Sequence, residues 1–237
     1  MTHGKNTEPG RKTWAWLKEL WHILTKYIFS TLYRHPPDYY LGLARDGYAP
    51  LVLLPGLTNR WSTMRYLADK LARRGHPVYI VGELGSNMQI ISSASRVVKE
   101  FMERHDLHGV ILVAHSKGGL VGKYYLVHDN ADERIRGMVA IAAPFGGSRP
   151  AGSFPLKSFK ELGEGSTVLR ELAKDVKANS RIISIYPEYD THTLIPEGSR
   201  LEGALGNVEI QTGGHNALLS DGRVVRETLR AIEQLSA

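Results

Sequence analysis

The chain has 237 residues, of which 42% are hydrophobic and none is cysteine. This size and composition favour one ordered α/β domain with a sizeable core, and the missing cysteine excludes disulfides, thiolate metal ligands and a cysteine nucleophile. Half of the net charge of +6 lies in the first 40 residues, with six Lys or Arg against three Asp or Glu. No basic block is interleaved with aromatic residues, so we expect no nucleic-acid partner.

The first predicted element is a helix in "TWAWLKELWHILTKYIFSTLY", residues 13–33, where apolar side chains recur at helical spacing. Charged residues interrupt it, which argues against a transmembrane span and against a signal peptide. We expect it to pack on the domain. The alternative is an interfacial helix that gives a peripheral membrane contact, because Trp and Lys suit lipid headgroups. We therefore expect a cytoplasmic protein, with membrane association as the alternative. Residues 1–47 form this helix and its lead-in.

Residues 48–237 predict a single domain in which strands alternate with helices. Because each strand is apolar throughout, the pattern predicts an α/β fold with a mostly parallel sheet of about six strands, covered by helices on both faces. Such a sheet carries its site beyond the carboxyl ends of the strands. The predicted strands are 49–56, 76–82, 109–115, 137–147, 181–190 and 207–215, and the predicted helices are 61–74, 89–104, 118–127 and 224–235. Residues 148–178 break the alternation and predict a lid-like insertion that overhangs this end of the sheet.

Ser116 follows the third predicted strand and precedes a helix, in "VAHSKGGL". A serine on such a turn projects its oxygen above the sheet, and small neighbours relieve backbone crowding. Gly118 fits the second small position, whereas Ala114 stands where the common pattern has glycine. An isolated A-x-S-x-G is usually a helix N-cap. The position after the third strand favours a nucleophile instead.

A serine nucleophile needs a base and an acid to orient the base. His215, in "TGGHNALL", follows the last strand, and His192 is its rival. Asp190 closes the fifth strand, and its alternative role is an Asx turn. Asp221 follows His215, which is the wrong side for the order Ser, Asp, His.

Two backbone N–H groups are needed to hold the oxyanion of an acyl-transfer intermediate. The expected donors are Lys117, directly after the nucleophile, and Leu57, directly after Pro55 and Gly56. The glycine lets the backbone approach the substrate closely, although it also suits an ordinary turn.

At these residues the chain resembles an α/β-hydrolase, and in particular the bacterial triacylglycerol lipase/esterase family. The resemblance runs from about residue 50 to the end and rests on "LVLLPGLTN", "VAHSKGGL", "AIAAPFGGS", "LGEGSTVLREL", "YD…IP" and "GGHNALL". Pro55 stands where the family often has histidine. The resemblance implies hydrolysis of acyl esters or lipids by Ser116, Asp190 and His215, without a cofactor. Some relatives bind calcium, but no acidic cluster here justifies a metal site.

The resemblance also implies that the insertion at 148–178 lines an acyl pocket or acts as a lid, with simple covering of the sheet as the alternative. A thioesterase, amidase or acyltransferase would use the same three residues, so these activities stay open. A non-catalytic binding module of the same fold is the remaining alternative, and the presence of all three residues argues against it.

Overall fold

The computed structural model describes residues 13–14, 16–17, 20–21, 33, 35–194 and 198–237. Its centre is a six-stranded sheet in the order β2-β1-β3-β4-β5-β6, in which every neighbouring pair is parallel. This confirms the predicted α/β architecture. The strands are β1 (Leu51–Leu54), β2 (Val78–Ile80), β3 (Val110–His115), β4 (Ile135–Ile141), β5 (Ile182–Tyr189) and β6 (Gly206–Gly213).

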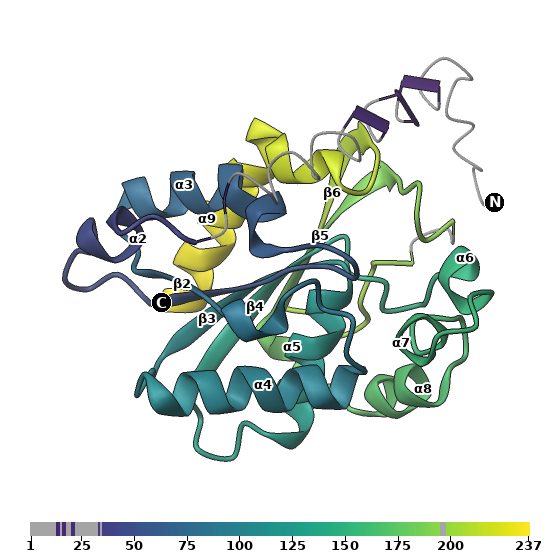
Figure 1. The fold of residues 1–237 in the computed structure, drawn as a ribbon, viewed down its shortest axis with the longest axis horizontal. Coiled ribbons are helices and arrows are strands. Elements are labelled where there is room, and N and C mark those ends of the chain that lie inside the picture. The colour runs from purple at the N-terminus through teal and green to yellow at the C-terminus, as the bar shows by residue number, and fades with distance from the viewer. Residues whose placement is uncertain (1–12, 15, 18–19, 22–32, 34, 195–197) are drawn as a thin grey trace.

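Four long helices cover the two faces of the sheet (Figure 1). Leu51 and Leu53 belong to the core that holds α3 and α9, whereas Val52 and Leu54 belong to the core that holds α4 and α5. Alternate residues of a strand point to opposite faces, so a strand buried on both faces must be apolar throughout. This explains the solid apolar runs of the sequence. The helices are α3 (Arg65–Arg74), α4 (Ile91–Arg104), α5 (Lys117–His128) and α9 (Gly222–Ser236).

The insertion between β4 and β5 holds three short helices, which lie together on one side of the molecule (Figure 1). They are α6 (Arg149–Gly152), α7 (Lys157–Lys160) and α8 (Thr167–Lys174). Leu162 and Leu169 pack with Leu120 of α5 in a third, smaller core. The stretch of the insertion around Leu162 and Leu169 therefore packs on α5. The other short helices are α2 (Tyr39–Gly42), η1 (Trp61–Met64), η2 (Gly82–Leu84), η3 (Lys177–Arg181) and η4 (Ala217–Ser220).

The fourth strand is shorter than predicted, because it ends at Ile141 and not at residue 147. Ala142 has φ 50°, which turns the chain out of the extended conformation. Gly146 then donates its N–H to the Gly198 oxygen (2.8 Å), outside the sheet. The apolar residues after Ile141 therefore form a buried loop at the carboxyl edge of the sheet.

The described residues between 13 and 21 are helical, as predicted, and their large apolar side chains are exposed by 49–67%. The rest of the predicted helix lies outside the described residues. The lead-in packs on α3, where Tyr39 and Tyr40 both donate to Asp69 (2.6 and 2.8 Å). Among the residues described, no helix combines the length and the apolar character needed to cross a membrane.

Candidate active site

Ser116 lies on a strained turn between β3 and α5. Its φ of 52° and ψ of −124° are unusual for a residue other than glycine, and strain of this kind gathers at functional sites. The Ser116 N–H donates to the Ile141 oxygen (2.9 Å), which fixes the turn to β4. Its side chain makes no capping hydrogen bond to α5. The side chain of Ser116 therefore does not cap α5.

The small residues around the serine are explained by close backbone contact. A Cβ on Gly118 would lie 2.2 Å from the Leu54 oxygen, so glycine is required there. Ala114 is fully buried within β3, in register with Leu54 and Ala140 on the neighbouring strands. Alanine is thus accommodated at the first small position.

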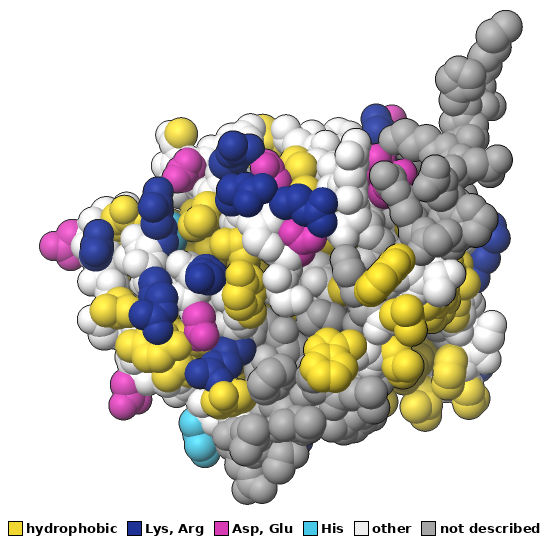
Figure 2. Space-filling view, turned by 90° about the horizontal axis from the view of Figure 1, so that it is seen from above, with side chains coloured by type: hydrophobic (Ala, Val, Ile, Leu, Met, Phe, Trp, Pro, Cys, Tyr) yellow, Lys and Arg dark blue, Asp and Glu magenta, His cyan; other side chains and the backbone are white. Residues whose placement is uncertain are grey.

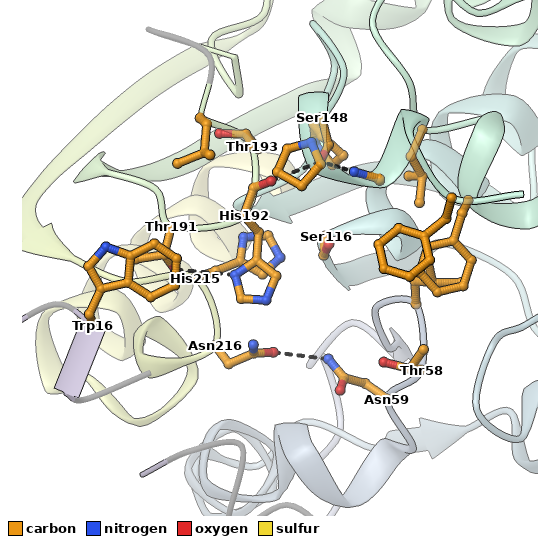
Figure 3. A pocket seen from close by; sticks show the side chains of 18 residues that line it. Trp16, Thr58, Asn59, Ser116, Ser148, Thr191, His192, Thr193, His215 and Asn216 are labelled. Atoms are coloured by element: carbon orange, nitrogen blue, oxygen red, sulfur yellow. Dashed lines mark hydrogen bonds between the residues drawn. The ribbon is translucent and has the colours of Figure 1, made fainter. Parts of the chain in front are cut away.

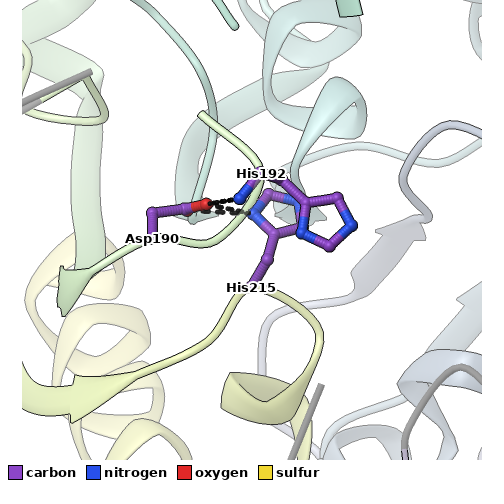
Figure 4. A group of neighbouring side chains, drawn as sticks. All are labelled: Asp190, His192 and His215. Carbon is purple, nitrogen blue, oxygen red and sulfur yellow. Dashed lines mark hydrogen bonds and ion pairs between the residues drawn. The ribbon is translucent and has the colours of Figure 1, made fainter. Parts of the chain in front are cut away.

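His215 and Asp190 form a buried pair at the carboxyl edge of the sheet (Figure 4). The Nδ1 of His215 lies 2.9 Å from Oδ2 and 3.1 Å from Oδ1 of Asp190, and the two side chains are 5% and 9% exposed. Asp190 follows β5 and His215 follows β6, so parallel pairing of these strands brings the two residues together. This contact leaves Nε2 as the ring nitrogen of His215 that can act as a base.

The Asp190 carboxylate also holds its own loop. Its Oδ1 accepts the N–H groups of His192 (2.7 Å) and Thr193 (3.0 Å), which is the Asx turn that the sequence allowed as an alternative. Burial raises the pKa of this carboxyl, but the charge and hydrogen bond of His215 and the two backbone N–H groups outweigh it, and the pKa is lowered overall. Asp190 is therefore an anion at neutral pH.

Two further histidines flank His215. The His192 ring stacks on it, with centroids 4.4 Å apart and planes at 26°. The centroid of the His115 ring lies 4.9 Å from that of His215, and the Nε2 of His115 is 3.3 Å from the His215 oxygen. Burial, followed by the charge of His215, lowers the pKa of His115 well below its usual value, so this ring is neutral. Asp190 contacts the His215 ring through Nδ1, whereas it contacts His192 through the backbone N–H. Asp221 instead caps α9 and binds Arg223.

Asp190, His192 and His215 could also be considered as metal ligands, because their ligand atoms lie within 4.8 Å of one another. A metal ion needs lone pairs that converge on one point. Nearly parallel, stacked rings direct their lone pairs side by side, and Nδ1 of His215 already binds Asp190. The arrangement fits an oriented imidazole better than a metal centre.

Leu57 and Lys117 each present a backbone N–H near the serine. Neither group donates a hydrogen bond to another described residue of the protein. A Cβ on Gly56 would lie 3.0 Å from the Cβ of Ser116, so glycine allows the loop after β1 to lie against this serine. Two free donors beside a serine are the arrangement that an oxyanion requires.

Ser116 and His215 open onto one cavity of about 440 Å³ (Figure 3). This volume lies in the range of small-molecule sites. The insertion contributes much of the apolar wall, including Phe154 and Phe159, whose rings stack at 5.0 Å. The first half of the insertion therefore lines the pocket. Other apolar lining residues are Trp16, Leu57, Pro144, Pro150, Ala151, Leu162 and Leu194.

Polar residues that the sequence reasoning missed also line the cavity. Asn59 donates its Nδ2 to Oδ1 of Asn216 (3.0 Å), which joins the loop after β1 to the loop of His215. Ser148 donates its Oγ to the His192 oxygen (2.8 Å), which joins the insertion to the acid loop. Asn216 directly follows the predicted base, but nothing in the sequence pairs it with Asn59.

Comparison with known proteins agrees with this geometry. Residues 49–166 match the family described as "alpha/beta hydrolase fold". The chain therefore has the α/β-hydrolase fold. A comparison with curated protein sequences finds no match.

Solved structures of α/β-hydrolases superpose on this chain at low identity. The mature lipase BlEst2 of Bacillus licheniformis has a TM-score of 0.64 at 14% identity, covering 86% of this chain and 96% of that one. The monoacylglycerol lipase of Paleococcus ferrophilus has a TM-score of 0.53 at 17% identity, covering 80% and 96%. An α/β-hydrolase enzyme from a lagoon-sediment metagenome has a TM-score of 0.56 at 20% identity, covering 79% and 90%. Identities in this range establish the fold alone.

Proposed function

We propose that this hydrolase-fold protein cleaves carboxylic acyl esters, as a lipase or esterase, through an acyl-enzyme intermediate. The observation that carries the proposal is the strained Ser116 turn on the same apolar cavity as the buried Asp190–His215 pair. A serine hydroxyl is a weak nucleophile unless a base accepts its proton, and an oriented imidazole supplies that base.

In the proposed reaction, Ser116 Oγ attacks the ester carbonyl while Nε2 of His215 accepts its proton. Asp190 keeps Nδ1–H of the imidazole oriented and stabilises the imidazolium, as its lowered pKa favours. The N–H groups of Leu57 and Lys117 bind the developing oxyanion. His215 then protonates the leaving alcohol, and a water molecule activated by the same ring releases the acyl group. None of these steps requires a cofactor.

The substrate class follows from the cavity wall. Phe154, Phe159 and Leu162 offer an apolar surface to an acyl chain, and no cationic side chain is among the lining residues of the described cavity. Burial of apolar surface contributes about 25 cal/mol per Å² to binding of such a chain. An ester with an aliphatic acyl group of moderate length therefore suits the site.

A labelling experiment tests the assignment. Wild type should react with a fluorophosphonate probe and hydrolyse p-nitrophenyl esters, while Ser116→Ala should lose the label and roughly 10⁴-fold or more of the turnover. Esters of rising acyl length, with a thioester and an anilide alongside, distinguish an esterase from a thioesterase, an amidase or an acyltransferase. Labelling of a different serine in wild type would refute the role of Ser116, and absence of both label and turnover would favour a binding module.

A peripheral lipid contact is part of the same proposal. Trp16 lines the cavity, and Trp14, Leu17, Leu20 and Trp21 are exposed on the same segment. In Figure 1, α6, α7 and this segment lie on the right-hand side of the molecule. Figure 2 shows hydrophobic side chains gathered on the same side. Exposed apolar clusters of this kind mark interaction sites, and tryptophan suits the headgroup region of a bilayer. We infer that the segment places the cavity mouth at a lipid surface.

A further inference from the structure

Lys117 places a charge inside the protein directly after the proposed nucleophile. Its side chain is fully buried, and Nζ donates to the oxygens of Asn87 (2.8 Å) and Gln89. Burial lowers its pKa to about 8, and Glu161 is the charged group that partly counteracts this. A buried ammonium costs free energy that an apolar side chain of similar length does not. The two hydrogen bonds of Nζ partly offset this cost.

Asn87 connects Lys117 to the loop after β1. It is fully buried, with φ 51°, a left-handed conformation that asparagine tolerates better than most residues. Its N–H donates to the Leu84 oxygen (2.7 Å), and its Nδ2 donates to the Pro55 oxygen (2.7 Å). Lys117 and Pro55 are thus joined through one asparagine.

The position of the Pro55 carbonyl affects the orientation of the peptide that carries the Leu57 N–H. Gly56 follows it, and a glycine leaves the next peptide free to rotate. That next peptide carries the Leu57 N–H, one of the two expected oxyanion donors. Its carbonyl oxygen, on Gly56, accepts the Asn59 N–H at 3.2 Å, a longer contact than the one at Pro55. Fixing the Pro55 carbonyl therefore limits where the Leu57 N–H can point.

We propose that Lys117 acts as a positioning residue through its side chain: with Asn87 it holds the Pro55 carbonyl and so keeps the Leu57 N–H aligned with the Lys117 N–H. One residue then supplies one oxyanion donor from its backbone and orients the other from its ammonium group. This inference rests on the proposed acyl transfer.

The test compares Lys117→Met and Asn87→Gly with wild type on p-nitrophenyl butyrate. Glycine accepts the φ of Asn87 while deleting the amide that binds Pro55. Each variant should lose about 10-fold or more in kcat with KM within about twofold, less than the 10²–10³ lost with a whole oxyanion donor. The double variant should be no slower than the slower single variant, because both break one connection. The affinity of an alkylboronic acid, whose adduct mimics the tetrahedral intermediate, should fall in parallel with kcat/KM.

Lys123→Met is the matched control. Lys123 lies on the same helix, is 2% exposed and also has its pKa lowered by burial to about 8, but among the described residues no hydrogen bond joins it to the Asn87 loop. Its variant should keep wild-type kcat. A folded Lys117→Met or Asn87→Gly with wild-type kcat, or a change confined to KM, would overturn the positioning role. A wild type without ester turnover or label would overturn the proposed function itself, and the positioning role with it. If Lys117→Met does not fold, Asn87→Gly and Lys117→Gln decide the matter.

Discussion

At the scale of single residues, His215 and His192 are the two neighbouring candidates for the base that accepts the Ser116 proton. Their rings stack, yet the Asp190 carboxylate binds Nδ1 of His215. We therefore expect His215→Ala to lose at least about 10³-fold in kcat/KM in a folded protein, because the serine loses its base. His192→Ala should retain most of the activity. Steady-state kinetics on one short ester measure both, with circular dichroism as the check on folding. The reverse result would place the base at His192.

Lys123 leads to a stability prediction of its own. Its described contacts include no hydrogen bond or ion pair, and its ammonium lies 5.9 Å from the Phe145 ring centroid. Burial lowers its pKa to about 8, although the charge of Asp175 opposes this. Lys123→Met should raise the melting temperature at pH 7, by an amount that reflects about 1 kcal/mol or more, because an unsatisfied buried charge is removed.

The pH dependence of this effect has a definite sign. Between pH 8 and the unfolded value of 10.5, the unfolded chain keeps the Lys123 proton that the folded chain has lost, so wild-type stability gains with rising pH from this group. Lys123→Met lacks this gain. The difference in melting temperature should therefore be largest below pH 8 and shrink above it. A difference that grows with pH would contradict the assignment of the lowered pKa.

At the scale of elements, the insertion divides into two parts with different contacts. Phe159 lies in α7 and lines the cavity, whereas Leu156, just before α7, is exposed and lies outside the lining. Phe159→Ala should shift the preferred acyl length upward and lower kcat/KM for the original best substrate by about 10-fold or more, because the deleted ring enlarges the cavity and even one methylene in an apolar pocket is worth ~1–3 kcal/mol. Leu156→Ala is the control and should leave the profile unchanged. The ester panel records both profiles, and an unaltered profile for Phe159→Ala would exclude α7 from acyl selection.

The elements that the sequence predicts well are those with a strong local pattern. Runs such as "GVILVAH" must be buried on both faces, and the turn after β3 follows from the small residues around Ser116. Such local signals give the sheet and place the Ser116, Asp190 and His215 segments at its carboxyl edge. The end of β4 was missed because Ala142 has a positive φ that alanine does not signal.

Other features escape sequence reasoning because they join distant loops. The Asn59–Asn216 hydrogen bond connects residues 157 positions apart, and the Lys117–Asn87 contact connects residues 30 apart. Asparagine and lysine are ordinary surface residues, so neither type indicates burial. Their partners become visible only when the strands are placed side by side.

At the scale of the whole molecule, the N-terminal segment is the part whose role truncation can decide. Tyr33 packs under the guanidinium of Arg65 (3.5 Å from the ring centroid), so the cut should fall before it. Since Trp14 and Trp21 are 67% and 66% exposed, removal of residues 1–32 should leave the melting temperature within a few degrees. It should abolish co-sedimentation with phospholipid vesicles and activity on emulsified lipid, while short soluble esters are still hydrolysed.

A strong fall in melting temperature after this truncation would instead support the helix that packs on the domain. A full-length variant with Trp14, Trp16 and Trp21 replaced by serine provides the second measurement. It keeps the chain length but removes the side chains suited to a lipid interface, so its vesicle binding should fall in the same way. Unchanged vesicle binding in that variant would show that another part of the surface makes the lipid contact.

The order of the site residues along the chain has a consequence for synthesis. The serine turn and both proposed oxyanion donors lie within residues 51–117, whereas Asp190 and His215 follow β5 and β6, the last two strands of the described sheet. A ribosome delivers the first group long before the second, and domains fold as the chain emerges. A nascent chain that ends before β6 would thus carry the serine without its base. If the triad acts as proposed, the growing polypeptide stays inert towards cellular esters until β6 and the loop of His215 have been synthesised.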